Sequence, residues 1–225
     1  MRRDKLLAEN QNALILSKLK NENLNDLPID FHFTQIWKVI PCETPKIIRK
    51  CTRCNADRFR SADKFRVNAN KKILDAWLIY KCIQCDFTLK LSIFRRTTVS
   101  KIESTLLQRL QENDQLLAWQ YAFDTNLHNG MQLDWEIDFE IQLQPFLEPS
   151  GVDLNTPKRH ILINSEYFLK ISIFAILRKK LEMSRNQLQK YEKEGVLKLY
   201  TLKGSDLSLK HSLGMGCILN TLPSH

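Results

Sequence analysis

Two Cys-x-x-Cys pairs constrain the fold of this chain of 225 residues more than any other feature. The first pair is Cys51 and Cys54, and the second is Cys82 and Cys85. A Cys-x-x-Cys turn presents two thiolates on one tight knuckle, and Zn²⁺ prefers four soft or borderline ligands at the corners of a tetrahedron. The two pairs therefore predict one structural Zn²⁺ site, in which four thiolates leave no coordination position open for catalysis.

The spacing of the two pairs predicts a zinc ribbon. The 27 residues between them exceed the roughly 15 to 20 of the usual zinc signature, and the extra length indicates a β-hairpin. Its strands are expected within 65–68 and 73–80, which are rich in aromatic and branched residues, with a turn at 68–70. Asn55 and Asp86 follow the knuckles, where the chain turns with positive φ, and these residue types tolerate that conformation.

Two other interpretations of the cysteines stay open at this point. The pairs are also compatible with two redox-active dithiols or with inert buried thiols. Cys42 and Cys217 are single, and we interpret both as ordinary free thiols. Cys42 lies close enough in sequence to the first knuckle to compete as a ligand.

Composition indicates a folded protein in a reducing compartment. With 43% hydrophobic residues the chain can bury a core in one or two domains. The longest apolar run near the N-terminus covers only residues 13–16, far short of a signal or membrane segment. We therefore expect a cytoplasmic protein without a membrane partner, where cysteines bind metal rather than form disulfides.

Charge is strongly segregated along the chain. The formal net charge is +9, but residues 46–72 alone carry +8, residues 103–153 carry −9 and residues 154–225 carry +7. Basic segments around an acidic one predict a chain that binds a polyanion and has an acidic region in its middle.

Hydrophobic periodicity predicts an α+β fold. We expect an N-terminal helical arm (1–30, with a helix over 4–22), an antiparallel zinc-ribbon domain (31–98), an acidic helical pair and strand (99–150), and a C-terminal two-helix module (158–222). The helical pair is expected over 100–113 and 115–127. Strict alternation over 135–143 predicts one half-buried strand whose outer face is acidic.

The C-terminal module is expected to contain strands over 161–163 and 167–171, followed by two helices. The first helix runs from Ser172 to Leu181, and the second begins at the N-cap Ser184 and ends at Gly195.

This module resembles the RNA-binding domain first described in the fourth protein of the small ribosomal subunit. The resemblance is carried by Ser184-Arg185, the helix 186–194, Gly195-Val196, and Gly214 or Gly216 near a late glycine turn. Ser172 stands where that domain usually has Asp, and its usual Val-Asn-Gly after the second helix is absent. The resemblance implies that the second helix and its basic neighbours lie on structured RNA.

The chain is also similar to a bacterial family of uncharacterised proteins, the domain of unknown function ten sixty-two. Residues 64–80, leading into Cys82, carry this similarity together with Trp37-Lys38-Val39 and Pro41. The similarity spans about residues 33–220 and implies no activity.

The preferred functional hypothesis is a zinc-stabilised protein that binds RNA, ribosomal or transfer RNA in particular. Phosphate contacts are expected from twelve basic residues: Arg49, Arg53, Arg58, Arg60, Arg66, Lys71, Lys72, Arg178, Lys179, Lys180, Arg185 and Lys190. Aromatic residues within the basic hairpin (Phe59, Phe65 and Trp77) are favoured as core residues over stacking platforms.

The alternative hypothesis is a protein-interaction adaptor. The acidic residues Asp134, Glu136, Asp138 and Glu140 would then meet a basic protein partner or the chain's own basic ribbon. An enzyme is disfavoured, because the six glycines form no phosphate-binding loop and the five histidines are scattered singly.

Overall fold

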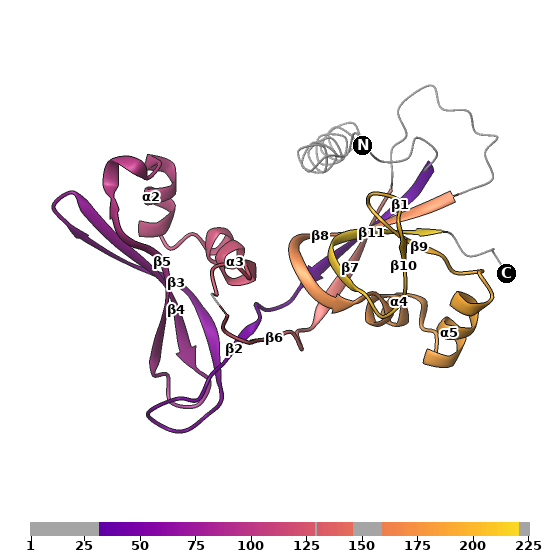
Figure 1. Ribbon diagram of the computed structural model, residues 1–225, viewed down its shortest axis with the longest axis horizontal. Helices are drawn as coiled ribbons and strands as arrows, with labels where there is room; N and C mark the ends of the chain where they lie inside the picture. Colours follow the sequence, from indigo (N-terminus) through magenta and orange to yellow (C-terminus); the bar gives the residue numbers. More distant parts are fainter. Residues whose placement is uncertain (1–31, 129, 146–158, 221–225) are drawn as a thin grey trace, which may run out of the picture. The chain divides into compact units, whose positions relative to one another are not determined.

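The computed structural model describes residues 32–128, 130–145 and 159–220 (Figure 1). The helix expected over 4–22 lies outside these residues. The described chain divides into two compact units, each with its own β-sheet. Residues 41–139 form the ribbon unit, and residues 32–40 together with 140–145 and 159–220 form the split unit.

The ribbon unit contains a five-stranded sheet in the order β5-β4-β3-β2-β6. Its strands are β2 (Lys46–Ile48), β3 (Arg58–Asn70), β4 (Ile73–Cys82), β5 (Thr88–Thr98) and β6 (Leu133–Asp134), and the neighbours pair antiparallel. The predicted hairpin is therefore confirmed. Its turn falls later than expected, because Asn70 still pairs with Ile73 and Lys71 takes the left-handed conformation, with φ of 55°.

Helices α2 (Ser104–Gln111) and α3 (Gln115–Phe123) pack against this sheet (Figure 1). Both helices are shorter than predicted: residues 99–101 form a 3-10 turn, and the second helix ends at Phe123. Asp114 starts α3, because its carboxylate accepts the Leu117 N–H at 2.9 Å.

The core of the ribbon unit lies between the helices and one face of β3, β4 and β5. Its buried side chains include Phe59, Leu74, Leu78, Tyr80 and Leu91 from the sheet and Leu110, Leu117, Ala118 and Ala122 from the helices. Phe65 joins them, with its ring edge-on to Tyr121 at 6.0 Å between centroids. The prediction that Phe59 and Phe65 are core residues is confirmed.

The split unit contains a six-stranded sheet in the order β10-β9-β11-β8-β1-β7. Its strands are β1 (His32–Pro41), β7 (Phe139–Pro145), β8 (Arg159–Ser172), β9 (Leu199–Thr201), β10 (Asp206–Leu207) and β11 (Ser212–Asn220). The first strand was expected in the ribbon domain, but β1 pairs parallel with β8, where Trp37 lies opposite Ile163. The strands expected over 161–163 and 167–171 form one continuous strand, β8.

The single acidic strand predicted over 135–143 is interrupted. Asp134 accepts the Glu136 N–H at 3.0 Å, and Asp138 accepts the Phe139 N–H at 2.8 Å. Such local side-chain bonds compete with the strand ladder. Strand β6 therefore ends in one sheet before β7 begins in the other. Ile137 and Phe139 are nevertheless buried, as the alternation predicted.

Two short helices follow β8, as predicted. They are α4 (Ile173–Leu181) and α5 (Arg185–Lys193). Ser172 caps α4 through the Ala175 N–H, and Ser184 forms a capping box with Gln187. Gly195 has φ of 71°, the left-handed conformation expected of a C-terminal glycine. Of the helices in the described ranges, none has the length and apolar character needed to span a membrane.

Candidate metal centre and basic sheet face

The four cysteines of the two pairs converge on one point. Their sulfur atoms all lie within 4.8 Å of one another, with 3.7 Å between Cys51 and Cys85 and 3.5 Å between Cys54 and Cys82. Four thiolates around Zn²⁺ at about 2.3 Å would place their sulfurs about 3.8 Å apart, whereas a disulfide would bring two sulfurs to about 2.05 Å. The arrangement thus fits a four-thiolate metal cage and not a pair of disulfides.

Backbone geometry builds each knuckle. The Asn55 N–H donates to the Cys51 carbonyl at 3.0 Å, and the Asp86 N–H donates to the Cys82 carbonyl at 3.2 Å. Asn55 and Asp86 have φ of 64° and 55°, so the predicted left-handed residues are confirmed. The Arg53 N–H also donates to the Cys51 sulfur at 3.4 Å, a contact that favours a thiolate.

The pKa values of two cysteine thiols in the cage shift in opposite directions. Burial raises the pKa of Cys82, but N–H groups of Cys85 and Gln84, helped by the Cys54 and Cys51 thiols, lower it to about 7. For Cys54 the Ala56 N–H lowers the pKa, yet desolvation and the three neighbouring sulfurs raise it to about 12. Because four adjacent thiolates repel one another, a bound cation would be needed to keep all of them ionised.

The remaining cysteines do not join the cage. Cys42 is exposed and its N–H donates to the Asp138 carbonyl at 2.8 Å. Among the residues that the structure describes, the metal-ligand cluster contains only the four predicted cysteines, so Cys42 is not part of it. Cys217 lies in β11, where burial raises the pKa of its thiol to about 12.

The second feature of the ribbon unit is the face of β3, β4 and β5 opposite the helices, which we call the outer face. Successive strand residues point to opposite sides of a sheet. Phe65 and Leu78 face each other in the register on the core side, so their neighbours Arg66 and Trp77 face each other on the outer side. None of the residues at outer-face positions of these three strands is buried, in contrast to the core side.

Basic side chains dominate the outer face: Arg58, Arg60, Lys64 and Arg66 on β3, Lys81 on β4, and Lys90 and Arg95 on β5, where the Arg95 Nε donates to the Ser92 hydroxyl at 3.1 Å. Lys64 and Lys90 flank Ile79 in the register, and Arg60 lies opposite Lys81. Asp75 is an acidic residue of this face, but it lies toward the hairpin turn and accepts the Arg96 N–H at 2.8 Å. Of these basic residues, the sequence prediction included Arg58, Arg60 and Arg66. Alternation within β3, β4 and β5 was the signal that would have added the three lysines.

Trp77 lies in the middle of this face. The Lys90 ammonium nitrogen is 5.3 Å from the centroid of the Trp77 ring, within the range of a cation–π contact. Trp77 is half-buried, and it packs in neither of the hydrophobic clusters of the ribbon unit. The prediction that Trp77 is a core residue is therefore wrong, because helices cover only the other side of β4.

The other predicted basic residues of the ribbon lie at or beyond the ends of β3 and β4. Arg49 and Arg53 are exposed beside the first knuckle, and Lys71 and Lys72 are exposed in the β3–β4 turn, roughly 30 Å away along β4. Arg58 is engaged: its Nε donates to Asp134 at 2.7 Å, and its Nη1 donates to Asp57 at 2.9 Å. Arg58 alternates with the core residue Phe59, so it lies at the knuckle end of the outer face, where these two carboxylates hold its guanidinium.

The predicted acidic docking residues separate into two kinds. Glu136, Asp138 and Glu140 are exposed. The Asp134 side chain is only 14% exposed, and the Glu136 N–H, together with Arg58, holds the pKa of its carboxyl below the ordinary value. Asp134 thus meets the chain's own ribbon at Arg58, the second of the two contacts predicted for it, and it stabilises the ribbon sheet.

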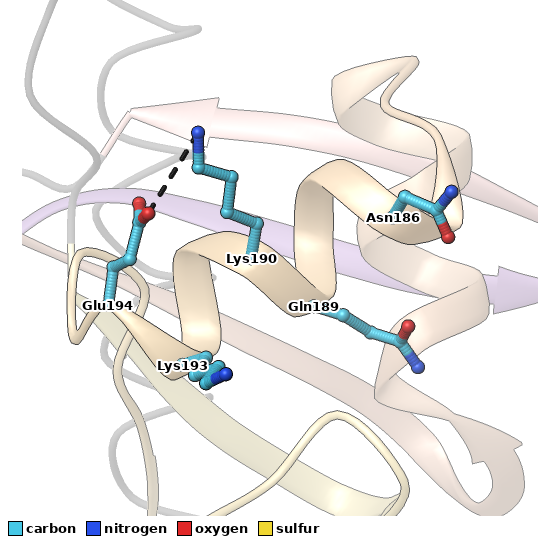
Figure 2. Close-up of a pocket in the computed structure, with 5 residues that line it drawn as sticks. All are labelled: Asn186, Gln189, Lys190, Lys193 and Glu194. Atoms are coloured by element: carbon cyan, nitrogen blue, oxygen red, sulfur yellow. Dashed lines mark ion pairs between the residues drawn. The ribbon is translucent and has the colours of Figure 1, made fainter.

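Basic residues of the split unit gather on α4 and α5. Arg178, Lys179, Arg185 and Lys190 are exposed. The Lys180 ammonium nitrogen lies 5.9 Å from the centre of the Trp37 ring, and the Arg185 guanidinium lies 5.7 Å from that of Phe174. A shallow hollow of about 480 Å³ along α5 is lined among the described residues by Asn186, Gln189, Lys190, Lys193 and Glu194. Figure 2 shows these five side chains. Lys190 and Glu194 pair across the hollow at 3.9 Å.

The late glycines do not form the expected turn. Gly214 and Gly216 lie inside β11, where the register with β8 shifts. Gly214 has φ of 62°, and a Cβ at Gly216 would come within 2.8 Å of the Ile163 carbonyl oxygen. The left-handed backbone thus favours glycine at position 214, and the close approach of β8 requires it at position 216.

Comparison with known proteins identifies the family but no function. The family described as "Protein of unknown function (DUF1062)" matches residues 67–203, from within β3 to the turn after β9. This span is shorter than the 33–220 expected from the sequence. No curated protein and no solved structure shows a significant match. None of these comparisons supports the ribosomal resemblance of the C-terminal module. Because the match covers more than half of the chain, the protein belongs to the DUF1062 family of proteins of unknown function.

Proposed function

We propose that this protein binds RNA through the basic outer face of a ribbon that a structural zinc ion stabilises. The observation that carries the proposal is the outer face itself: basic side chains surround a half-buried tryptophan on a sheet whose other side is covered by helices. Basic side chains neutralise phosphates, and an aromatic ring among them offers a surface to bases.

The zinc ion has a structural part in this proposal. Cys51 and Cys82 are buried in the core cluster that also contains Phe59 and Tyr80. A cage there joins the end of β4 to the loop that precedes β3. Metal binding would fix the ends of β3 and β4 that carry Arg60 and Lys81. The free energy of metal binding would become folding free energy of the ribbon.

Phosphate contact determines how the binding should behave. Lysine and arginine contacts to phosphates hold the ligand without reading its sequence, and they release counterions. Binding should therefore tolerate many sequences and weaken steeply with salt. The basic residues of α4 and α5 would add a second surface, because Arg178, Lys179, Arg185 and Lys190 are exposed on these two helices.

Charge reversal on the outer face tests the proposal. Lys64→Glu and Arg66→Glu change two exposed residues of β3, and Lys198→Glu and Lys210→Glu change two exposed residues of the split unit by the same charge. Affinity for a labelled RNA is measured by fluorescence anisotropy over a range of salt concentrations. We expect the β3 pair to weaken binding about tenfold or more and to reduce the salt slope by about 1.4.

The control pair carries the same net charge change and should leave both quantities close to those of the wild type. Equal losses in the two double variants would mean that net charge alone attracts RNA. No measurable RNA binding by the zinc-loaded wild type would refute the proposal. A DNA strand of the same sequence, titrated in parallel, separates RNA from nucleic acid in general.

A further inference from the structure

We infer that the outer face takes an unpaired stretch of RNA, with one base stacked on Trp77; this inference rests on the proposed function and specifies its ligand. Trp77 is the only aromatic residue at an outer-face position of β3, β4 and β5, all of which lie in the described part of the chain. An aromatic ring at this position allows the face to distinguish single-stranded from duplex RNA.

The residues around Trp77 can contact both the base and the phosphates of a nucleotide. Arg66 lies directly opposite it on β3, and Ser92 lies directly opposite it on β5. Lys64 and Lys90 occupy the next outer-face row. Adjacent strands are about 4.8 Å apart and outer-face rows about 6.8 Å apart. A base over the indole would thus have its phosphates within reach of three basic side chains.

Lys90 has two roles in this arrangement. Without RNA its ammonium lies near the Trp77 ring, at 5.3 Å from the centroid. An exposed cation–π contact is weaker than the stacking of a base on an aromatic side chain. An incoming base can therefore displace the ammonium, which is then free to contact the phosphate beside that base.

A duplex cannot use this site in the same way. Its bases are stacked on one another, so neither face of a base is available to an indole. The major groove of an A-form helix is too deep and narrow for side chains on a sheet to read. The outer face would contact a duplex only through phosphates, so the ring should favour single strands.

The test compares single-stranded with duplex RNA in the full-length, zinc-loaded protein. An oligouridine of about 12 nucleotides and a blunt duplex of equal length serve as probes. For Trp77→Ala we expect single-strand affinity to fall about tenfold or more, while duplex affinity changes less than about twofold. Trp77→Phe should retain most of the single-strand affinity, because phenylalanine also stacks.

Ile79→Ala is the matched control, since Ile79 is a half-buried residue of the same face and strand. It should change neither affinity. If Trp77→Ala fails to fold, as judged by zinc content and circular dichroism, tryptophan emission provides a second measure. Oligouridine should quench the emission of the wild type strongly and that of Trp77→Phe weakly.

The outcomes separate this inference from the proposed function. Equal affinity of the wild type for single strand and duplex, or a Trp77→Ala variant that binds oligouridine like the wild type, overturns the stacking site. Charge reversal at Lys64 and Arg66 would still show whether the face binds RNA through phosphates. If none of these variants loses affinity for either the single strand or the duplex, both the stacking site and the proposed RNA-binding function are overturned.

Discussion

The guanidinium of Arg58 donates a hydrogen bond of 2.7 Å from its Nε to the carboxylate of Asp134, joining the start of β3 to β6. The sequence prediction assigned Arg58 to RNA, and it assigned Asp134 to a basic partner or to the chain's own ribbon. The pair connects two strands on either side of β2, at the end of the ribbon sheet. Asp134 also accepts the Glu136 N–H at 3.0 Å, so its carboxylate stabilises the turn that ends β6.

Asp134→Asn should therefore destabilise the ribbon unit. The amide keeps the shape of the side chain but loses the charge that strengthens both hydrogen bonds. We expect a lower urea midpoint for Asp134→Asn than for Glu136→Gln, which removes a neighbouring exposed carboxylate. Equal midpoints for the two variants at neutral pH would mean that the Arg58 contact contributes nothing measurable.

Removal of the metal should unfold the ribbon and spare the C-terminal helices. Elemental analysis of the purified protein should find about one zinc per chain. After chelation we expect amide hydrogens of β3 and β4 to exchange rapidly, while those of α4 and α5 stay protected. Cys82→Ser should reduce the zinc content to near zero, and Cys42→Ser should leave it unchanged. A zinc content that falls in both variants would place Cys42 in the metal site.

His128 should make stability depend on pH. Its Nδ1 lies 2.7 Å from the Asp124 carbonyl, which can only accept, so Nδ1 carries the proton and Nε2 faces the Tyr80 hydroxyl at 3.3 Å. Burial lowers the pKa of His128 below 6.5, against the opposing effect of the Asp124 carbonyl. The unfolded chain therefore takes up a proton first as the pH falls. The contribution of neutral His128 is present in full above pH 6.5 and is lost progressively below it.

Unfolding measured in urea between pH 7.5 and 5.5 checks this expectation. The stability of His128→Gln should fall less over this range than that of the wild type, because glutamine does not titrate. Thiolate protonation contributes equally to both proteins, so the difference between their slopes isolates His128. Parallel slopes would assign the pH dependence to the cysteines alone.

Charge reversal on α5 should weaken RNA binding without unfolding the protein. Arg185 is the first residue of α5 and Lys190 lies on its exposed side. A glutamate at position 185 suits the positive end of the helix dipole, so Arg185→Glu with Lys190→Glu should keep the fold. We expect affinity to fall about three- to tenfold in a filter-binding titration and the salt slope to fall by about 1.4. An unchanged titration would mean that α4 and α5 do not contact RNA and have a structural role only.

Local signals in the sequence predicted local structure well. The knuckles, the left-handed Asn55 and Asp86, and the N-cap Ser184 each follow from a few neighbouring residues, and the structure has them as expected. Each depends on the shape of one turn. No long-range pairing is needed to decide them.

Long-range features were not predictable in the same way. The alternation of β1 is compatible with many partner strands, and nothing in residues 32–41 indicates that the partner is β8. Likewise, the alternation of β4 shows that Trp77 and Leu78 lie on opposite faces but not which face the helices cover. That choice depends on packing between distant segments, and it decides whether Trp77 is core or surface.

The parallel pairing of β1 with β8 has a consequence for synthesis of the protein. Trp37 leaves the ribosome long before its partner Ile163, and the whole ribbon unit is translated in between. A nascent β1 must therefore wait with its backbone unpaired, while the ribbon can close as soon as Cys85 and the following strand emerge. Any shortage of metal during translation would lengthen the time for which two unfinished sheets are exposed to other chains.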